Sequence, residues 1–366
     1  MRAKEMTCWL SGAGLGAALL GMAVGGAALA RGAEETRRKA EGGRPSIPAV
    51  SKAREAEFAA ELKKIPHKIL YETFQDNNWD LFIANADGSH PVNLTHTPDV
   101  DELYPHANND GTKICFLADE GKGHDKVRNL YVMNIDGSGR TLLVKNARDP
   151  CWSADGTKIA YLKGEFDEFT FTDYASKGLY VYDMKSGSHR QHCNHSIEHL
   201  YNLCWSPDGK WFVATVHGAM GFSHAILAVE ADGMKVVDLK ISGCRPDLSA
   251  DGRHIAWGCS DWALRVADFD TSGPEPRVRN ARSVVESAKP MEVYHIDWSP
   301  DGKYVAFSRG PSSKRLGFSC PMIGVRAEGW NICVADVAET NCYVTITHDG
   351  KSHKEPDWAP VRNRRP

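Results

Sequence analysis

The sequence shows no excess of charge of either sign. Its 366 residues include 44 Lys and Arg against 47 Asp and Glu, which gives a formal net charge of −3. A balance this close to zero gives no electrostatic reason to expect a nucleic acid or a strongly acidic substrate as partner. Clues to the function must therefore come from motifs and repeats.

Long stretches of helical periodicity are also scarce, whereas glycine (33 residues) and aromatic residues (9%) are plentiful. This combination is typical of an all-β chain with many short strands. The sequence outside its first 30 residues lacks a Gly-x-Ser-x-Gly elbow and a phosphate-binding glycine loop, so enzymes that depend on these motifs are not indicated.

The ten cysteines never stand in Cys-x-x-Cys spacing. Nine would remain if a leader containing Cys8 were removed, and they are scattered and odd in number. The pattern predicts neither a zinc site nor a disulfide framework. We expect most of them to be small buried residues within strands.

One short pattern recurs along the chain. Residues 297–307 read Asp-Trp-Ser-Pro-Asp-Gly-Lys-Tyr-Val-Ala-Phe, which predicts a strand, a tight turn and a second strand, because Pro, Asp and Gly each favour turn geometry. Further copies, one of them degenerate, have their turn aspartate at Asp110, Asp155, Asp208 and Asp251. Successive copies lie 43 to 53 residues apart, and a repeat of about 40–50 residues with four strands is typical of a β-propeller blade.

The number of repeats predicts how the ring closes. Second and third strands each occur six times, but the first of these second strands, residues 68–72, has no first strand before it. Conversely, residues 355–360 form a first strand after which the chain ends. We therefore predict an all-β fold: a six-bladed β-propeller of four-stranded antiparallel blades, closed by pairing of the C-terminal first strand with the N-terminal strands.

The N-terminus has the features of an export signal. Arg2 and Lys4 give a basic start, residues 13–30 are apolar, and residues 28–30 (Ala-Leu-Ala) offer a cleavage site. An uncleaved membrane anchor is the alternative, since the apolar run just reaches the ~18 residues that a span needs. The sequence predicts a signal peptide at 1–30, a linker with a short helix (residues 53–64) at 31–66, the propeller at 67–360 and a basic tail at 361–366.

The repeat resembles the TolB-like, WD40-like Asp-Gly propeller family. The resemblance rests on Trp-Ser-Pro-Asp-Gly-Lys before an apolar strand and on Leu-Tyr-Val-Met-Asn-x-Asp-Gly, and it extends over residues 67–360. It implies an exported six-bladed propeller, and TolB propellers bind the peptidoglycan-associated lipoprotein and colicins. The small α/β domain that precedes the TolB propeller has no counterpart here, because residues 31–66 are too few to form it.

Alignment of the first strands on their turns predicts two polar rings around a central channel. Residues five and three positions before the turn are mostly apolar and are expected to pack between blades. The intervening positions are polar. The upper ring consists of Tyr104, Asp149, Asn202, Arg245, His295 and Glu355, and the lower ring of His106, Cys151, Cys204, Asp247, Asp297 and Asp357. We expect the upper ring and His106 to bind a ligand, although a water-filled channel with structural hydrogen bonds would have the same pattern.

Three lower-ring aspartates come from consecutive blades. Asp247, Asp297 and Asp357 would repel one another unless a cation or protons intervene. Clusters of oxygen ligands suit Ca²⁺ or Mg²⁺, so a metal site is one hypothesis. The alternative is that each carboxylate accepts a hydrogen bond from a neighbouring backbone amide.

Long loops, several of them rich in aromatic residues or histidine, are predicted at residues 163–177, 217–224 and 310–330. They should share one face of the propeller and suggest a binding surface there. His195-Ser196-Ile197-Glu198-His199 matches the inverted zinc-peptidase motif, but that motif requires a helix and here lies between two strands. A metallopeptidase is therefore not indicated.

Two functions remain open from the sequence. The first is an exported monomer, periplasmic or secreted, that binds an envelope protein or a glycan through the loop face and the channel mouth. It contacts a membrane only if the signal is retained. The second is a polysaccharide lyase or hydrolase, or a peptidase-like enzyme, with an acid/base pair drawn from His295, Glu355, Asp149 and Arg245.

Overall fold

The Asp-Gly turns link the two innermost strands of five blades. In the turn at residues 299–302, Ser299 Oγ donates to Asp301 Oδ1 at 2.7 Å and Gly302 N donates to Ser299 O at 2.9 Å. Gly302 has a φ of 69°, the left-handed region that glycine adopts without strain. Ser206–Gly209 and Ser249–Gly252 repeat these contacts, so the same local chemistry forms equivalent hairpins.

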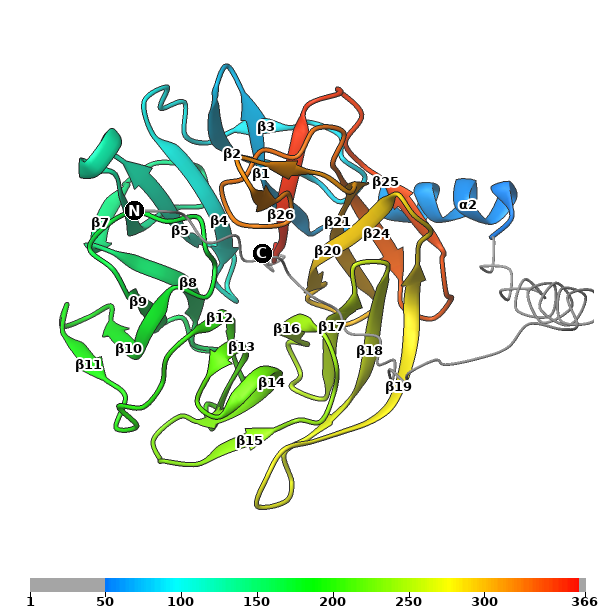
Figure 1. Ribbon diagram of the computed structural model, residues 1–366. Coiled ribbons are helices and arrows are strands. Elements are labelled where there is room, and N and C mark those ends of the chain that lie inside the picture. The colour runs from blue at the N-terminus through cyan, green and yellow to red at the C-terminus, as the bar shows by residue number, and fades with distance from the viewer. Residues whose placement is uncertain (1–49, 362–366) are drawn as a thin grey trace, which may run out of the picture. The chain divides into compact units, whose positions relative to one another are not determined.

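The computed structural model describes residues 50–361, which form a six-bladed β-propeller of four-stranded antiparallel blades (Figure 1). Blade 1 contains β4 (Asp101–Ala107), β5 (Lys113–Glu120), β6 (Val127–Asn134) and β7 (Thr141–Val144), with the 3-10 turn η1 (Gly123–Asp125) between β5 and β6. Blade 2 contains β8 (Ala147–Trp152), β9 (Lys158–Gly164), β10 (Ser176–Asp183) and β11 (His189–Gln191). Blade 3 contains β12 (Leu200–Trp205), β13 (Trp211–Ala219), β14 (Phe222–Glu230) and β15 (Val236–Asp238).

The remaining blades follow the same order. Blade 4 contains β16 (Cys244–Leu248), β17 (His254–Ser260), β18 (Ala263–Asp270) and β19 (Arg277–Glu286). Blade 5 contains β20 (Met291–Trp298), β21 (Tyr304–Pro311), β24 (Asn331–Asp336) and β25 (Tyr343–Thr345), and the small hairpin of β22 (Lys314–Arg315) and β23 (Phe318–Ser319) lies between β21 and β24.

Blade 6 joins the two ends of the propeller sequence. Its strand order is β26 (Ser352–Ala359), β1 (Lys68–Gln75), β2 (Asn78–Asn85) and β3 (Val92–Asn93). β26 pairs antiparallel with β1, so Trp358 lies opposite Ile69, and the two strands lie side by side in Figure 1. This is the pairing predicted from the count of first and second strands.

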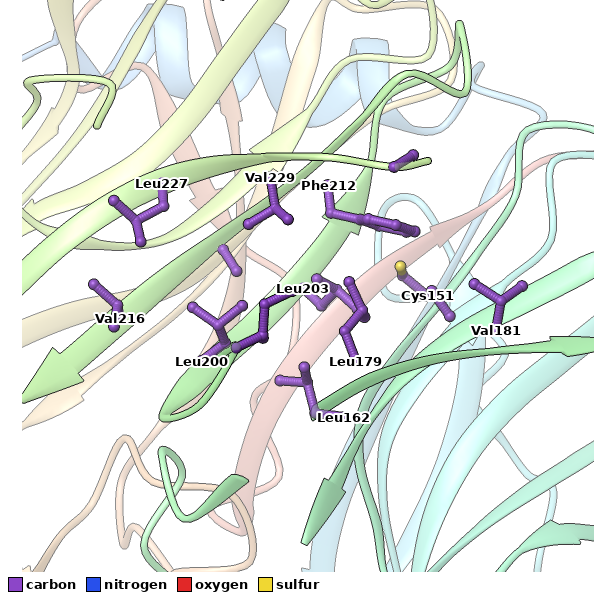
Figure 2. Close-up of a cluster of buried hydrophobic side chains, with 14 of the residues drawn as sticks. Cys151, Leu162, Leu179, Val181, Leu200, Leu203, Phe212, Val216, Leu227 and Val229 are labelled. Carbon is purple, nitrogen blue, oxygen red and sulfur yellow. The ribbon is translucent and has the colours of Figure 1, made fainter. Parts of the chain in front are cut away.

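Apolar side chains from adjacent blades pack between them. One such cluster joins blades 2 and 3: Leu162 and Leu179 contribute from blade 2, and Phe212 and Leu227 from blade 3 (Figure 2). All four are fully buried. Burying a side chain of this size stabilises the fold by about 1.5–3 kcal/mol, so the interfaces between blades form the hydrophobic core.

Helix α2 (Lys52–Leu62) packs on blades 5 and 6. Its N-cap Ser51 accepts a hydrogen bond from Arg54 N at 3.2 Å. Phe58 and Leu62 are buried in a cluster with Ile346 and other residues of those blades. The sequence predicted a short helix at residues 53–64, and α2 spans Lys52–Leu62.

Several expectations concern residues that the structure does not describe. The signal peptide at 1–30, its cleavage site, linker residues 31–49 and tail residues 362–366 lie outside the described part. Within residues 50–361, no helix has the length and apolar character needed to cross a membrane. The nine cysteines in this range are all free thiols.

Candidate functional site

Each of the six innermost strands carries a β-bulge at the same place. The strand register shifts next to six residues that have a left-handed backbone: Tyr104 (φ 52°), Asp149 (44°), Asn202 (50°), Arg245 (56°), His295 (56°) and Glu355 (49°). These six are the predicted upper ring. A left-handed conformation costs a residue other than glycine roughly 1–2 kcal/mol, so each of the six innermost strands carries one strained residue beside the channel.

The bulges correct one part of the sequence interpretation. The sequence interpretation treated each first strand as continuous, with side chains pointing alternately to its two faces. A bulge inserts a residue and redirects the side chains next to it. A signal for this was present, because proline follows the left-handed residue directly in four blades: Pro105, Pro150, Pro246 and Pro356. Proline cannot donate to a strand ladder and is confined to edge strands, strand starts and bulges.

A cavity of about 310 Å³ occupies the channel. Its lining includes most of the residues that the sequence singled out: Tyr104, His106, Asn202, Arg245, Asp247, His295, Asp297, Glu355 and Asp357. Asp149 lies outside this lining. It is buried, and its Oδ1 accepts a hydrogen bond from Asn202 N at 2.8 Å, so it supports the bulge of the next blade.

The cavity opens on the face that carries the Asp-Gly turns. Its lining includes a turn residue from each of five blades, and Pro360 at the equivalent place after β26 in blade 6: Asn109, Ala154, Pro207, Ala250, Pro300 and Pro360. Tryptophans Trp152, Trp205, Trp298 and Trp358 follow below them. These side chains also contact the clusters between blades, so the residues predicted to pack between blades also form part of the channel wall.

The opposite end of the channel is filled by residues 320–324, which we call the plug. Lys354 Nζ donates to the carbonyls of Cys320 (3.1 Å) and Met322 (2.7 Å). The Pro321 carbonyl accepts from Arg245 Nη2 at 3.0 Å and lies 2.7 Å from His295 Nε2. Backbone carbonyls of one inserted loop thus satisfy buried cationic and imidazole donors from blades 4, 5 and 6.

A second segment supports the plug. Asp173 Oδ1 accepts from the backbone amide of Ile323 at 3.1 Å, and Asp173 Oδ2 bonds with Arg245 Nη2. Arg148 holds the same segment by donating to the carbonyls of Thr170 and Thr172, both at 3.1 Å. Loops 163–177 and 310–330, which were predicted to form a binding surface, therefore each contribute one short segment, residues 170–173 and 320–324, to closing the channel. The third predicted loop, 217–224, is instead a β-hairpin.

The three lower-ring aspartates hold the backbones of neighbouring blades. Asp247 Oδ2 accepts from Trp298 N at 2.9 Å, and Asp297 Oδ2 accepts from Trp358 N at 2.7 Å. Asp357 Oδ2 accepts from Ala107 N at 2.7 Å. This is the alternative to a metal site that the sequence left open, and each contact links one blade to the next.

Protons and a histidine balance the charge of these acids. Asp297 shares a side-chain hydrogen bond with Asp247. Burial raises the pKa of Asp247 to about 7 and raises the pKa of Asp297 well above its usual range. His106 Nδ1 lies 2.8 Å from Asp357 Oδ1; burial lowers the pKa of His106, but this contact outweighs it and raises the pKa overall. Within residues 50–361 no group of three or more His, Cys, Asp or Glu side chains is placed to hold a metal ion, so the geometry gives the Ca²⁺ or Mg²⁺ hypothesis no support.

Glu355, His295 and Arg245 form a buried polar triad between the cavity and the plug. Glu355 Oε1 lies 2.9 Å from His295 Nε2 and 3.7 Å from Arg245 Nη1. Burial raises the pKa of Glu355 to about 7, and burial together with nearby cations lowers the pKa of His295 well below its usual range. The carboxyl group therefore changes its charge near neutral pH.

Several buried polar atoms around the cavity have no hydrogen-bond partner in the protein. Among the described residues that line it, these atoms are His106 Nε2, Asn202 Oδ1, His295 Nδ1, Trp298 Nε1 and Trp358 Nε1. An unpaired buried polar atom costs about 1–3 kcal/mol. A channel with this many unpaired donors and acceptors is suited to a polar ligand or to ordered water.

Comparisons with solved structures show the fold. The chain is similar to TolB from Acinetobacter baumannii, with 20% identity and a TM-score of 0.59, over 84% of this chain and 71% of TolB. It is also similar to Kuenenia stuttgartiensis hydrazine synthase (13% identity, TM-score 0.56), over 86% of this chain and 50% of that one. A nidogen/laminin complex gives 10% identity and a TM-score of 0.55, over 80% of this chain and 98% of that one. No protein-family model and no curated protein matches the sequence.

Proposed function

We propose that this TolB-like propeller is a binding module that takes a segment of a protein or glycan into its channel from the face of the Asp-Gly turns. The observation that carries the proposal is the cavity of about 310 Å³, which is lined by buried polar atoms without protein partners. Ligand pockets commonly combine an apolar wall with a few convergent polar groups. Here the tryptophans supply the wall, and the two rings supply the polar groups.

The fold supports this proposal in a general way. A propeller with the TolB architecture is a rigid frame, and its innermost strands hold the ring side chains at fixed positions. The partner expected from the sequence, an envelope protein or a glycan met after export, remains part of the proposal. The route of entry differs from that expectation, because plug residues fill the channel at the loop face.

A ligand selection that includes a blocked channel tests the proposal. The full chain would be probed with a displayed peptide library and a glycan array, and each ligand would be measured again on an Ala250→Trp variant, in which a large side chain narrows the mouth. Leu316→Trp is the matched control, because Leu316 is 83% exposed and does not line the cavity.

We expect at least one ligand class to bind the wild type, to lose tenfold or more in affinity on Ala250→Trp and to be unaffected by Leu316→Trp. Binding that is insensitive to Ala250→Trp but lost on Leu316→Trp would contradict the proposal. It would place the binding surface on the loop face.

The polar triad favours a second candidate, an enzyme that cleaves a polysaccharide or peptide. Glu355 borders the cavity, has a pKa of about 7 and lies 2.9 Å from His295, and a general acid or base works best with a pKa near the working pH. The test is turnover of soluble polysaccharides and peptides by the wild type and by Glu355→Gln. If Glu355→Gln still turned over a substrate, Glu355 would be excluded as the acid or base. If the wild type turned over no substrate in the panel, the binding module would be favoured.

A further inference from the structure

Two histidines face each other on the hairpin of blade 3. β13 and β14 remain paired almost to their turn, and His217 lies directly opposite His224 in the register. Their Nδ1 atoms are 3.4 Å apart. The pair is separate from the channel, because neither residue lines the cavity.

Neighbouring groups fix the orientation of both rings. His224 Nε2 lies 3.0 Å from the carbonyl oxygen of Gly243. A carbonyl only accepts, so this Nε2 carries the proton, and the Nδ1 of a neutral His224 presents a lone pair towards His217. Tyr174 packs against the His217 ring, with centroids 4.3 Å apart. A histidine whose other nitrogen donates to a carbonyl is the usual arrangement of a metal ligand.

The separation of the two nitrogens fits a shared metal ion. A tetrahedral ion with metal–nitrogen bonds of about 2.0–2.1 Å places two such ligands about 3.3–3.4 Å apart. Burial is the main cause that lowers the pKa of both His217 and His224. The nearby His199 is itself 3.2 Å from Glu165 Oε2.

We propose that His217 and His224 form a two-histidine site for a divalent transition ion such as Zn²⁺, Ni²⁺ or Cu²⁺, with solvent completing the coordination. Imidazole nitrogens favour these ions over Ca²⁺ and Mg²⁺. Among the described residues no group of three or more ligating side chains surrounds this position. The site is therefore an open one, with coordination positions left for exchangeable ligands.

Metal titration of the untagged full chain tests this site. Zn²⁺ and Ni²⁺ would be titrated into the wild type, His217→Gln and His224→Gln, with affinity measured by competition against a chromophoric chelator. His124→Gln is the matched control, because His124 is a solvent-exposed histidine in the turn η1. Circular dichroism and thermal unfolding without metal would verify that each variant folds.

We expect one equivalent of metal to bind the wild type and His124→Gln alike, and the affinity to fall tenfold or more in each of the other two variants. The same loss in both is the signature of two ligands sharing one ion. Absence of saturable binding to the wild type, or unchanged affinity in His224→Gln, would overturn the proposal and leave the pair as a hydrogen bond between two imidazoles. Neither outcome bears on the channel, since the two sites do not share residues.

Discussion

At the scale of single residues, the six left-handed positions around the channel are the most unusual feature. Asn202 has a φ of 50°, and glycine is the residue that adopts such a φ without strain. We predict that Asn202→Gly is more stable than Asn202→Ala by about 1–2 kcal/mol, although both lose the same side-chain contacts. Urea denaturation of the two variants measures this difference.

The neighbouring residue provides the control for this comparison. Leu203 has no left-handed φ, and in a strand glycine is the worse choice because it loses more conformational freedom on folding. The order should therefore reverse there, with Leu203→Ala more stable than Leu203→Gly. The same order at both positions would mean that Asn202 is not strained.

The aspartate pair predicts a dependence of stability on pH. The folded protein holds protons on Asp247 (pKa about 7) and Asp297 (pKa raised) that the unfolded chain releases above about pH 4. The stability that the folded protein gains by holding these protons is therefore fully present below about pH 4, and it is lost as the pH rises through about 7. We expect Asp297→Asn to lessen this loss by about 1–3 kcal/mol, because the amide still accepts from Trp358 N and donates to Asp247 without a charge.

The measurement is urea denaturation at a series of pH values from 4 to 8. Asp232→Asn is the control, because the Asp232 side chain is 81% exposed and its charge has little effect on stability. If Asp297→Asn lost stability between pH 5 and pH 8 as steeply as the wild type, the two aspartates would not share a proton.

Residue types identified most of the channel lining, but not what each residue does. Of the twelve polar-parity positions that the sequence assigned to the two rings, eleven border the cavity, and Asp149 is the exception. The partners of Asp247, Asp297 and Asp357 were open, because a carboxylate that binds a metal and one that accepts from a backbone amide look the same in a sequence. Only the geometry of the neighbouring blade distinguishes them.

At the scale of elements, the backbone carbonyls of the plug accept hydrogen bonds from buried cationic side chains of the blades. Lys354 is fully buried and donates to two plug carbonyls, and Glu72 Oε1 lies 3.7 Å away. We predict that Lys354→Met destabilises the protein by about 3–5 kcal/mol, because it leaves buried acceptors without their charged partner. Amide exchange in residues 320–325 should also accelerate by tenfold or more relative to the strands of blade 4.

Hydrogen exchange with mass spectrometry resolves these segments. Lys314→Met is the matched control, because Lys314 lies in the same inserted loop but is exposed. A uniform rise in exchange throughout the propeller would show that Lys354 stabilises the fold as a whole and does not specifically hold the plug.

The plug could not have been predicted from the sequence. Residues 310–330 have the composition of a surface loop, with several glycines, two prolines and three basic residues. Their burial depends on donors that lie far away in the sequence, at Arg245, His295 and Lys354. Strand repeats, in contrast, are local patterns, which is why the blades themselves were predicted from residues 67–360 with little error.

At the scale of the whole propeller, closure depends on one strand. β26 provides the innermost strand of blade 6 and pairs with β1 across more than 270 residues of sequence. We predict that a chain ending at residue 351 does not fold cooperatively, because β1 and the adjoining blades lose their partner. A synthetic peptide of residues 352–361 added in trans should restore the cooperative transition.

Circular dichroism during thermal unfolding measures the recovery. A peptide of the same composition in scrambled order is the control, since it keeps the charge but loses the register with β1. Cooperative folding of the truncated chain without any peptide would show that the other five blades close without β26.

In the whole propeller, the proposed function requires that the channel is entered from the Asp-Gly turns and closed by the plug. Three thiols report directly on access to the channel: Cys151 and Cys204 line the cavity, whereas Cys320 is buried in the plug.

The most direct measurement is the rate at which a small methanethiosulfonate reagent labels each thiol, read by mass spectrometry in the wild type and in Ala250→Trp. Exposed Cys193 and fully buried Cys115 set the upper and lower limits of reactivity. We expect Cys151 and Cys204 to react more slowly than Cys193 but faster than Cys115 and Cys320. We also expect Ala250→Trp to slow the labelling of Cys151 and Cys204. Labelling of Cys320 before Cys151 and Cys204, unaffected by Ala250→Trp, would contradict this route of entry.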